Sequence, residues 1–232
     1  MQEHEGTIPV YISAAKVLLA AVGPAQRFVQ SPAVTHRMIN RQARKILYND
    51  GYKKQAGLLD EFSITLDKGA AWADNGFKNM SHFYNPRTLK GIYGWTHAVR
   101  ECSLFWNKAV YCWQEANYEK SFFYIGASIH LLQDLCVPHH AMGILFDGHQ
   151  EYEEWVDGSK ENYAVNSDGH YRLAITPAEW LRKNALIAVR YYNLTRAGST
   201  EQHYHKATRV LLSLAQRSTA GFINSFLNKF GI

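Results

Sequence analysis

The sequence predicts an all-α fold, a single compact helical bundle. Apolar residues recur at helical spacing in several segments, and no strand pattern of convincing length appears. At 232 residues, with 47% hydrophobic and 19% charged residues, the chain is long enough to bury one sizeable core. It has no internal repeat and no low-complexity linker, so we expect one domain.

The N-terminal residues 1–25 resemble a secretory signal, which would leave a domain at 26–232. Residues 8–22 are apolar apart from Lys16, and a cut after Ala25 would create a new N-terminus. Acidic residues stand where positive charge is typical, so a structural segment is the alternative. No apolar run reaches the roughly 18 residues that a membrane-spanning helix needs.

The helical segments are separated by short polar connections. The first is expected at 35–49, with Thr35 as a possible N-cap. Pro138 ends one helix, and Pro177 suits the first turn of another. The remaining helices are expected at 53–73, 96–116, 118–136, 150–163, 177–192 and 203–230. Residues 74–94, 138–149 and 166–174 are expected to form loops.

Aromatic residues concentrate in the segment 96–116. Trp106, Val110 and Trp113 share one helical face there, which indicates core packing. A lipid-interface belt is the alternative, and it would use Trp95, Trp106, Tyr111, Trp113 and Tyr124.

The segment 118–136 places two polar residues on an apolar helix. His130 and Asp134 are four residues apart, so they lie on one face, one turn apart. A buried, unpaired Asp134 would be costly unless it met a cation. The alternative is a hydrogen-bonded core histidine beside an acid at the rim.

Further ligand types surround this pair in the sequence. His140 follows Pro138, and His149 and Glu153 form a second pair with a spacing of four. The full candidate set is His36, Asp74, His82, His130, Asp134, His140, His149 and Glu153. Zinc prefers imidazole nitrogen and carboxylate oxygen. Five histidines and three acids exceed the needs of one ion. Two or three zinc ions fit better, and such clusters act on phosphate esters.

This order of ligands resembles that of the bacterial zinc-dependent phospholipases C. The segments THRMINRQA, SHFYNP, FFYIGASIHLLQD and PAEWLRKNALIAV are similar to segments of that family in the same order, and the likeness covers roughly residues 33–230. The resemblance implies a helical fold with three zinc ions in a cleft. It also implies a phospholipase C that cleaves glycerophospholipids at a membrane surface into diacylglycerol and a phosphorylated head group, in a secreted or extracytoplasmic protein.

The resemblance also assigns roles to the ligands. Asp74, His82 and His130 would hold one zinc, which Asp134 would bridge to a second. His36 would share that second ion with Asp134. The remaining zinc would be held by His140, His149 and Glu153. Asp74 would be the catalytic general base, and His139 is the alternative to its neighbour His140.

The chain departs from the family pattern in two places. The family completes the His36 site with an N-terminal Trp, whereas the first Trp here is Trp72. Two aromatic positions that favour a choline head group hold Asn75 and Asn79, with Phe77 as a local substitute. Because quaternary ammonium groups bind aromatic faces, we expect weaker choline selectivity.

Other readings remain open. The net charge of +5 favours anionic partners, and zinc-dependent single-strand nucleases share this fold and nearly this ligand order. They typically have Asp at the position of Glu153. A non-catalytic metal-binding or membrane-binding domain is a further alternative, which Asp74 argues against. The three cysteines indicate no disulfide framework, and no nucleotide-binding motif is present.

Overall fold

The computed structural model describes residues 33–75, 80–92, 94 and 96–232. Within these ranges the chain is helical, with one isolated bridge between Asn85 and Lys90 and no strand. The predicted all-α fold class is therefore confirmed. The signal-like segment predicted at 1–25 lies outside the described residues.

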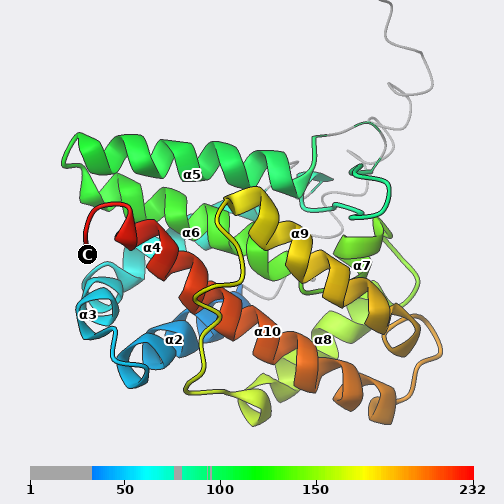
Figure 1. The fold of residues 1–232 in the computed structure, drawn as a ribbon. Helices are drawn as coiled ribbons and strands as arrows, with labels where there is room; N and C mark the ends of the chain where they lie inside the picture. The colour runs from blue at the N-terminus through cyan, green and yellow to red at the C-terminus, as the bar shows by residue number, and fades with distance from the viewer. Residues whose placement is uncertain (1–32, 76–79, 93, 95) are drawn as a thin grey trace, which may run out of the picture.

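The helices form a bundle in which α5 and α6 run side by side and α10 crosses obliquely beneath them (Figure 1). The α-helices are α2 (Val34–Asn49), α3 (Lys53–Glu61), α4 (Ser63–Ala73), α5 (Ala98–Gln114), α6 (Tyr118–Asp134), α7 (Pro138–Met142), α8 (His149–Ser159), α9 (Pro177–Ala188) and α10 (Glu201–Asn228). Two 3-10 helices are η2 (Lys160–Tyr163) and η3 (Val189–Leu194).

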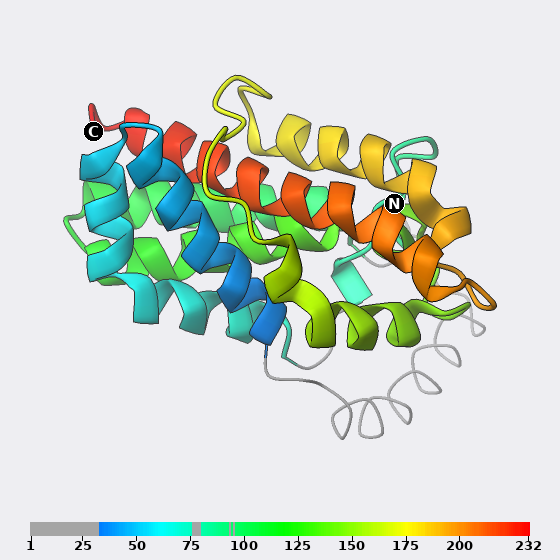
Figure 2. The same ribbon diagram turned by 90° about the horizontal axis from the view of Figure 1, so that it is seen from below.

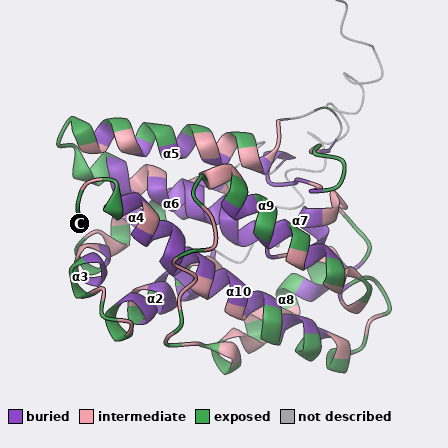
Figure 3. Cartoon of the chain, viewed as in Figure 1, coloured by how far each residue is buried: buried purple, intermediate pink, exposed green. Residues whose placement is uncertain are grey.

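Helix α6 is the central helix and packs against α4, α5, α9 and α10. Phe122, Ile125 and Ile129 are completely buried in it, and Figure 3 shows the helix as mostly buried. A helix that is covered on all sides is expected to be apolar all round. His130 and Asp134 near its C-terminal end are therefore exceptional and need polar or ionic partners.

Two glycines allow α4 and α6 to approach each other closely. A Cβ atom on Gly69 would lie 1.9 Å from the carbonyl oxygen of Phe123, and one on Gly126 would lie 2.0 Å from that of Leu66. Neither contact is sterically possible, so any larger residue must push the helices apart. The close packing brings the C-terminal end of α4 to the C-terminal half of α6.

The helix predicted at 53–73 is two helices, and the prediction of one continuous helix was wrong. Phe62 ends α3 and precedes α4, with φ −98° and ψ 16°. Its ring stacks on Phe122 at a centroid distance of 4.5 Å. The chain bends here because tertiary packing of this aromatic side chain overrides helical periodicity.

Thr35 does not cap the first helix as predicted. Ala33 occupies the N-cap position, and Thr35 lies within α2. The hydroxyl group of Thr35 donates instead to the carboxylate of Asp157 in α8. This bond joins the N-terminal end of α2 to α8, which lie close together in the view from below (Figure 2).

The region after Pro138 is more helical than predicted. Pro138 begins the short helix α7 inside the expected loop, and α8 begins at His149 rather than 150. The helices predicted at 150–163 and 177–192 both tighten into 3-10 turns in their last residues. A 3-10 turn is common at the end of an α-helix, where the last backbone groups lack an α-helical hydrogen-bond partner.

The aromatic residues of α5 mainly form core, as predicted. Trp106 is buried against Phe222 and Phe226 of α10, and Trp113 packs on Phe230. Tyr111 is exposed, and Trp95 lies outside the described residues. None of the helices in the described ranges has the length and hydropathy needed to span a bilayer.

We predict that Gly69→Ala and Gly126→Ala each lower the free energy of unfolding by at least about 1–3 kcal/mol, because the added methyl group meets backbone atoms. Gly57→Ala is the matched control. Its Cβ would meet nothing within 4 Å, and Ala is the better helix former, so it should stabilise by about 0.5–1 kcal/mol. Denaturant unfolding measures all three, and equal effects would contradict the close-packing explanation.

Candidate metal centre

The first part of the site is built on the last turns of α6. His130 and Asp134 are 1% and 5% exposed, and His130 Nε2 lies 3.2 Å from Asp134 Oδ2. Asp74, the C-cap of α4, places Oδ1 3.9 Å from the same His130 nitrogen. His82 places Nδ1 2.8 Å from Asp134 Oδ2. Potential ligand atoms of Asp74, His82 and His130 all lie within 4.8 Å of one another.

Helix α2 brings His36 to the other side of the Asp134 carboxylate. His36 Nε2 lies 3.5 Å from Asp134 Oδ1, and the rings of His36 and His130 are 4.1 Å apart between centroids. His36, His130 and Asp134 therefore form a second group of three potential ligands. Asp134 faces both groups, with one oxygen toward each.

A third group comes from α7 and α8. Glu153 Oε1 lies 3.3 Å from His140 Nε2 and 3.0 Å from His149 Nε2. The ring of Phe83 stacks against His140 at a centroid distance of 4.7 Å. Because α8 begins at His149, its side chain and that of Glu153 are one turn apart on the same face.

One cavity of about 430 Å³ joins the three groups. All the sequence-predicted ligands line it except His130, which is buried and is not among the lining residues. The structure thus brings together every residue of the predicted set.

Two acids of the ligand groups, Asp134 and Glu153, are held as carboxylates. Burial acts to raise the pKa of Asp134, but the charges of neighbouring histidines, His130 first, hold this pKa well below its usual value. Burial also acts to raise the pKa of Glu153. The charge of His149 and the hydrogen bonds from His140 and His149 outweigh this effect and hold the pKa of Glu153 well below its usual value. Each acid therefore keeps its negative charge for a cation.

The histidine pKa values respond to the same charges. Burial acts to lower the pKa of His82, but the Asp134 carboxylate outweighs this effect and raises it. His149 behaves in the same way beside Glu153, and its pKa is raised. For His36, burial and the nearby His130 prevail and the pKa is lowered.

The donor set fits a divalent cation. His82 Nε2 lies 3.1 Å from the carbonyl oxygen of Ala73, so this nitrogen carries the ring proton. Its other nitrogen then points a lone pair at Asp134 Oδ2, which is buried and lacks a hydrogen bond of acceptable geometry. The repulsion between these atoms is relieved by a second ring proton or by a cation. A buried set of imidazole and carboxylate donors suits zinc.

His139 does not join the third group. Its Nε2 faces the carbonyl oxygen of Asp147 at 3.0 Å, and its ring stacks on His149 at 4.9 Å. Burial and then the charge of His149 lower its pKa to about 4. His140 is the member of the pair that faces Glu153.

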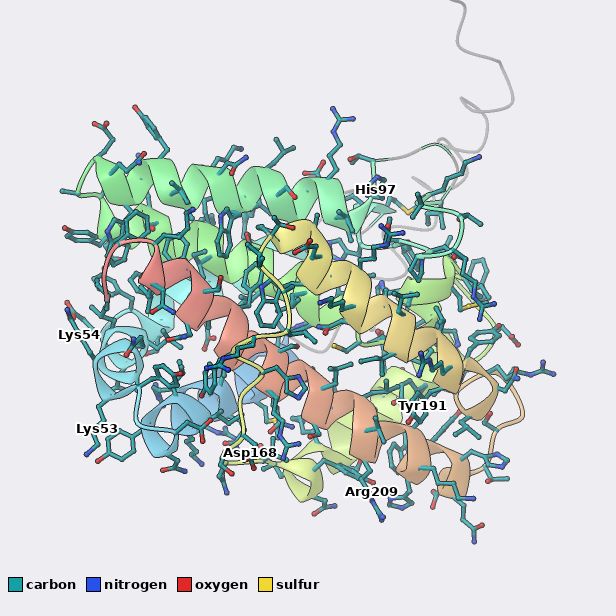
Figure 4. The ribbon with its side chains drawn as sticks, viewed as in Figure 1. Lys53, Lys54, His97, Asp168, Tyr191 and Arg209 are labelled. Carbon is teal, nitrogen blue, oxygen red and sulfur yellow. The ribbon has the colours of Figure 1, made fainter. Side chains whose placement is uncertain are left out.

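Three histidines outside the ligand groups cap helices or lie at the surface. His97 caps the N-terminal end of α5 (Figure 4), and His203 completes a capping box at the start of α10. His205 is exposed and bonds to Tyr163.

The sequence pattern did not single out Gln133. This side chain is 2% exposed, and its Oε1 lies 2.7 Å from His36 Nδ1. Its position three residues after His130 on the same polar face was the available signal. In the predicted head-group region, Asn75 is exposed, while Phe77 and Asn79 lie outside the described residues.

Comparison with known proteins identifies the family. A family model described as zinc dependent phospholipase C matches residues 35–197. The chain belongs to the zinc-dependent phospholipase C family. The resemblance found in the sequence is thereby confirmed, and zinc is the cofactor of this family.

Named relatives of this zinc-dependent phospholipase C family member are phospholipases C from several bacteria. The Bacillus cereus protein is 27% identical, covering 84% of this chain and 80% of its own length. The Listeria monocytogenes protein is 27% identical, covering 84% and 77%. The Paraclostridium bifermentans protein is 25% identical, and the match covers 84% of this chain but 58% of that relative.

Solved structures support the fold. The alpha toxin of Clostridium absonum superposes with a TM-score of 0.76 at 21% identity, covering 86% of this chain and 65% of the toxin. The Clostridium perfringens alpha-toxin gives a TM-score of 0.72 at 23% identity, covering 84% and 63%. This family member thus spans less than two thirds of both toxins.

We predict that zinc binding by this family member releases protons and weakens as the pH falls. Because the pKa values of His82 and His149 are raised, the metal-free protein holds protons at a pH where ordinary histidine is neutral. Each displaced proton should weaken binding about tenfold per pH unit of acidification. Calorimetry in two buffers of different ionisation enthalpy measures the release.

His205→Gln, at an exposed position outside the cavity, is the control and should leave the proton release unchanged. Zinc affinity that stays constant from the ordinary histidine pKa to about one unit above it would contradict the prediction.

Proposed function

We propose that this chain is a zinc-dependent phosphodiester hydrolase, and specifically a phospholipase C that cleaves glycerophospholipids to diacylglycerol and a phosphorylated head group. The observation that carries the proposal is one cavity that combines three groups of metal-ligand side chains with apolar walls. Those walls include Ile39, Met80, Leu145, Phe146, Val156 and Leu212.

The chemistry follows from the side chains that face the cavity. Bound zinc would lower the pKa of a water molecule and counter the charge that develops on the phosphoryl oxygens. His82, His130 and Asp134 would fix the position of that chemistry in a buried environment. Asp74 is 28% exposed at the cavity wall, so its carboxylate can meet both a ligand site and solvent. We assign it the role of general base.

The lining of the cavity favours a lipid over a nucleic acid. Among the described residues that line it there is no Lys or Arg, whereas Glu151, Glu154 and Asp157 are present. A polynucleotide requires cationic side chains along its phosphates. An acidic, partly apolar cleft instead suits a single phosphodiester with a cationic head group and acyl chains, which supports the phospholipase over the single-strand nuclease.

The setting of the reaction is also a proposal. A phospholipid substrate places the chain at a membrane surface, and the signal-like residues 1–25 support a secreted or extracytoplasmic location, with the domain at 26–232. The positive net charge of +5 supports attraction to anionic membranes.

We predict that the purified protein holds two or three zinc ions and hydrolyses phosphatidylcholine in a chelator-sensitive manner. Elemental analysis gives the metal content, and release of phosphorylated head group gives the activity, with single-stranded nucleic acid assayed in parallel. If the protein binds zinc and cleaves the nucleic acid but not the lipid, the single-strand nuclease would replace the phospholipase C as the proposed function. A protein without zinc would refute both readings.

We also predict that Asp74→Asn retains the fold and the zinc of the other groups but lowers kcat by about 10²–10⁴-fold, because a general base is lost. The matched control is Asp168→Asn on the exposed surface (Figure 4), which should keep full activity. An Asp74→Asn protein with its full zinc complement and full activity would refute the assignment.

A further inference from the structure

Gln133 connects the His36 side of the centre to the interior of the bundle. Its Oε1 faces His36 Nδ1 at 2.7 Å. Its Nε2 lies 2.9 Å from Asn40 Oδ1 and 3.2 Å from Thr219 Oγ1. All three partners of the Gln133 amide are side chains, from α2 and α10.

The network continues from Asn40 to Asp67 in α4. Asn40 Nδ2 donates to Asp67 Oδ1 at 2.8 Å. The Asp67 carboxyl oxygen accepts this bond, so the Asn40 amide presents its nitrogen to Asp67 and its oxygen to Gln133. Gln133 must then present its nitrogen to Asn40 and its oxygen to His36. The direction of every bond is thus set by the acid at the end.

The last bond in this chain decides the tautomer of His36. Because Gln133 offers an acceptor, the proton of the ring must lie on Nδ1. The Nε2 atom then carries a lone pair, and it lies 3.5 Å from Asp134 Oδ1 in the second ligand group. A histidine binds a metal through such a lone pair.

We propose that Gln133 is a positioning residue that holds His36 in the Nδ1–H tautomer and aims its Nε2 at the metal site shared with Asp134. The inference rests on the proposed zinc centre, but not on which ester the centre hydrolyses.

The contrast with the other histidines of the centre supports a dedicated role. His82 and His149 direct their second ring nitrogen to main-chain carbonyl oxygens, of Ala73 and Leu145. Their tautomers therefore follow from the backbone. Among the described ligand candidates, His36 is the one whose second nitrogen bonds to another side chain, so a single substitution can uncouple it.

Zinc affinity provides the test. Gln133→Met keeps the length of the side chain but removes the acceptor, and we expect one zinc to bind about 10–100-fold more weakly while the others are unchanged. His36→Ala identifies the affected ion, because it should weaken the same one. Chelator competition on the full zinc-loaded chain measures each affinity, without any activity assay.

Two further variants separate positioning from packing. Gln133→Glu keeps an acceptor for His36 but loses the bonds that Gln133 donates to Asn40 and Thr219. Its zinc affinity should therefore stay within a few-fold of the wild type, whereas its Tm should fall. Gln216→Met removes another fully buried glutamine, which bonds to Tyr163 and Leu212 carbonyl oxygens, and should lower Tm without changing zinc affinity.

Several outcomes would overturn the inference. The first is an unchanged zinc affinity in Gln133→Met or in His36→Ala. The second is a loss of zinc affinity in Gln133→Glu as large as that in Gln133→Met. The third is a ring proton on His36 Nε2, observed by nitrogen-15 NMR of the zinc-loaded wild type. If Gln133→Met fails to fold, the Gln133→Glu affinity and the NMR tautomer decide. A wild type that binds no zinc would instead refute the proposed function.

Discussion

The Asp134 carboxylate, buried at the end of α6 between two sets of imidazole rings, is the feature on which the rest of the site depends. A buried charge is stable only when ionic and hydrogen-bonding partners surround it. His36 approaches one of its oxygens, and His82 with His130 approaches the other. We propose that this arrangement lets the carboxylate bridge two metal ions, which would explain why an otherwise apolar central helix ends in polar residues.

The packing of the bundle is organised so that these partners can arrive. Gly69 and Gly126 let α4 approach α6 until backbone nearly meets backbone. As a result, Asp74 at the end of α4 faces His130. The same end of α4 supplies the Ala73 carbonyl oxygen that orients His82. The position of Asp74 and the orientation of His82 therefore both depend on the close contact between α4 and α6. A shift of α4 would move the Asp74 carboxylate and the Ala73 carbonyl together.

The cavity unites two kinds of surface that the proposed phospholipase activity would need. Its ligand groups are polar and strongly ionic, whereas residues such as Leu145 and Phe146 add apolar area at the same opening. Phe146 is 67% exposed and lies between His140 and His149 of the third ligand group along the chain. Because the chain spans 58% of its Paraclostridium relative, the catalytic unit proposed here corresponds to part of some family members.

The sequence by itself determined the fold class, most helix positions and the identity of the candidate ligands. Helical periodicity depends on local spacing, so the pairs His130–Asp134 and His149–Glu153 could be placed on single faces in advance. The tertiary structure alone decided the break at Phe62, the choice of nitrogen on each ring and the link from Gln133 to His36. These features depend on contacts between residues far apart in the chain, and local spacing carries no information about which distant acceptor a ring nitrogen will meet.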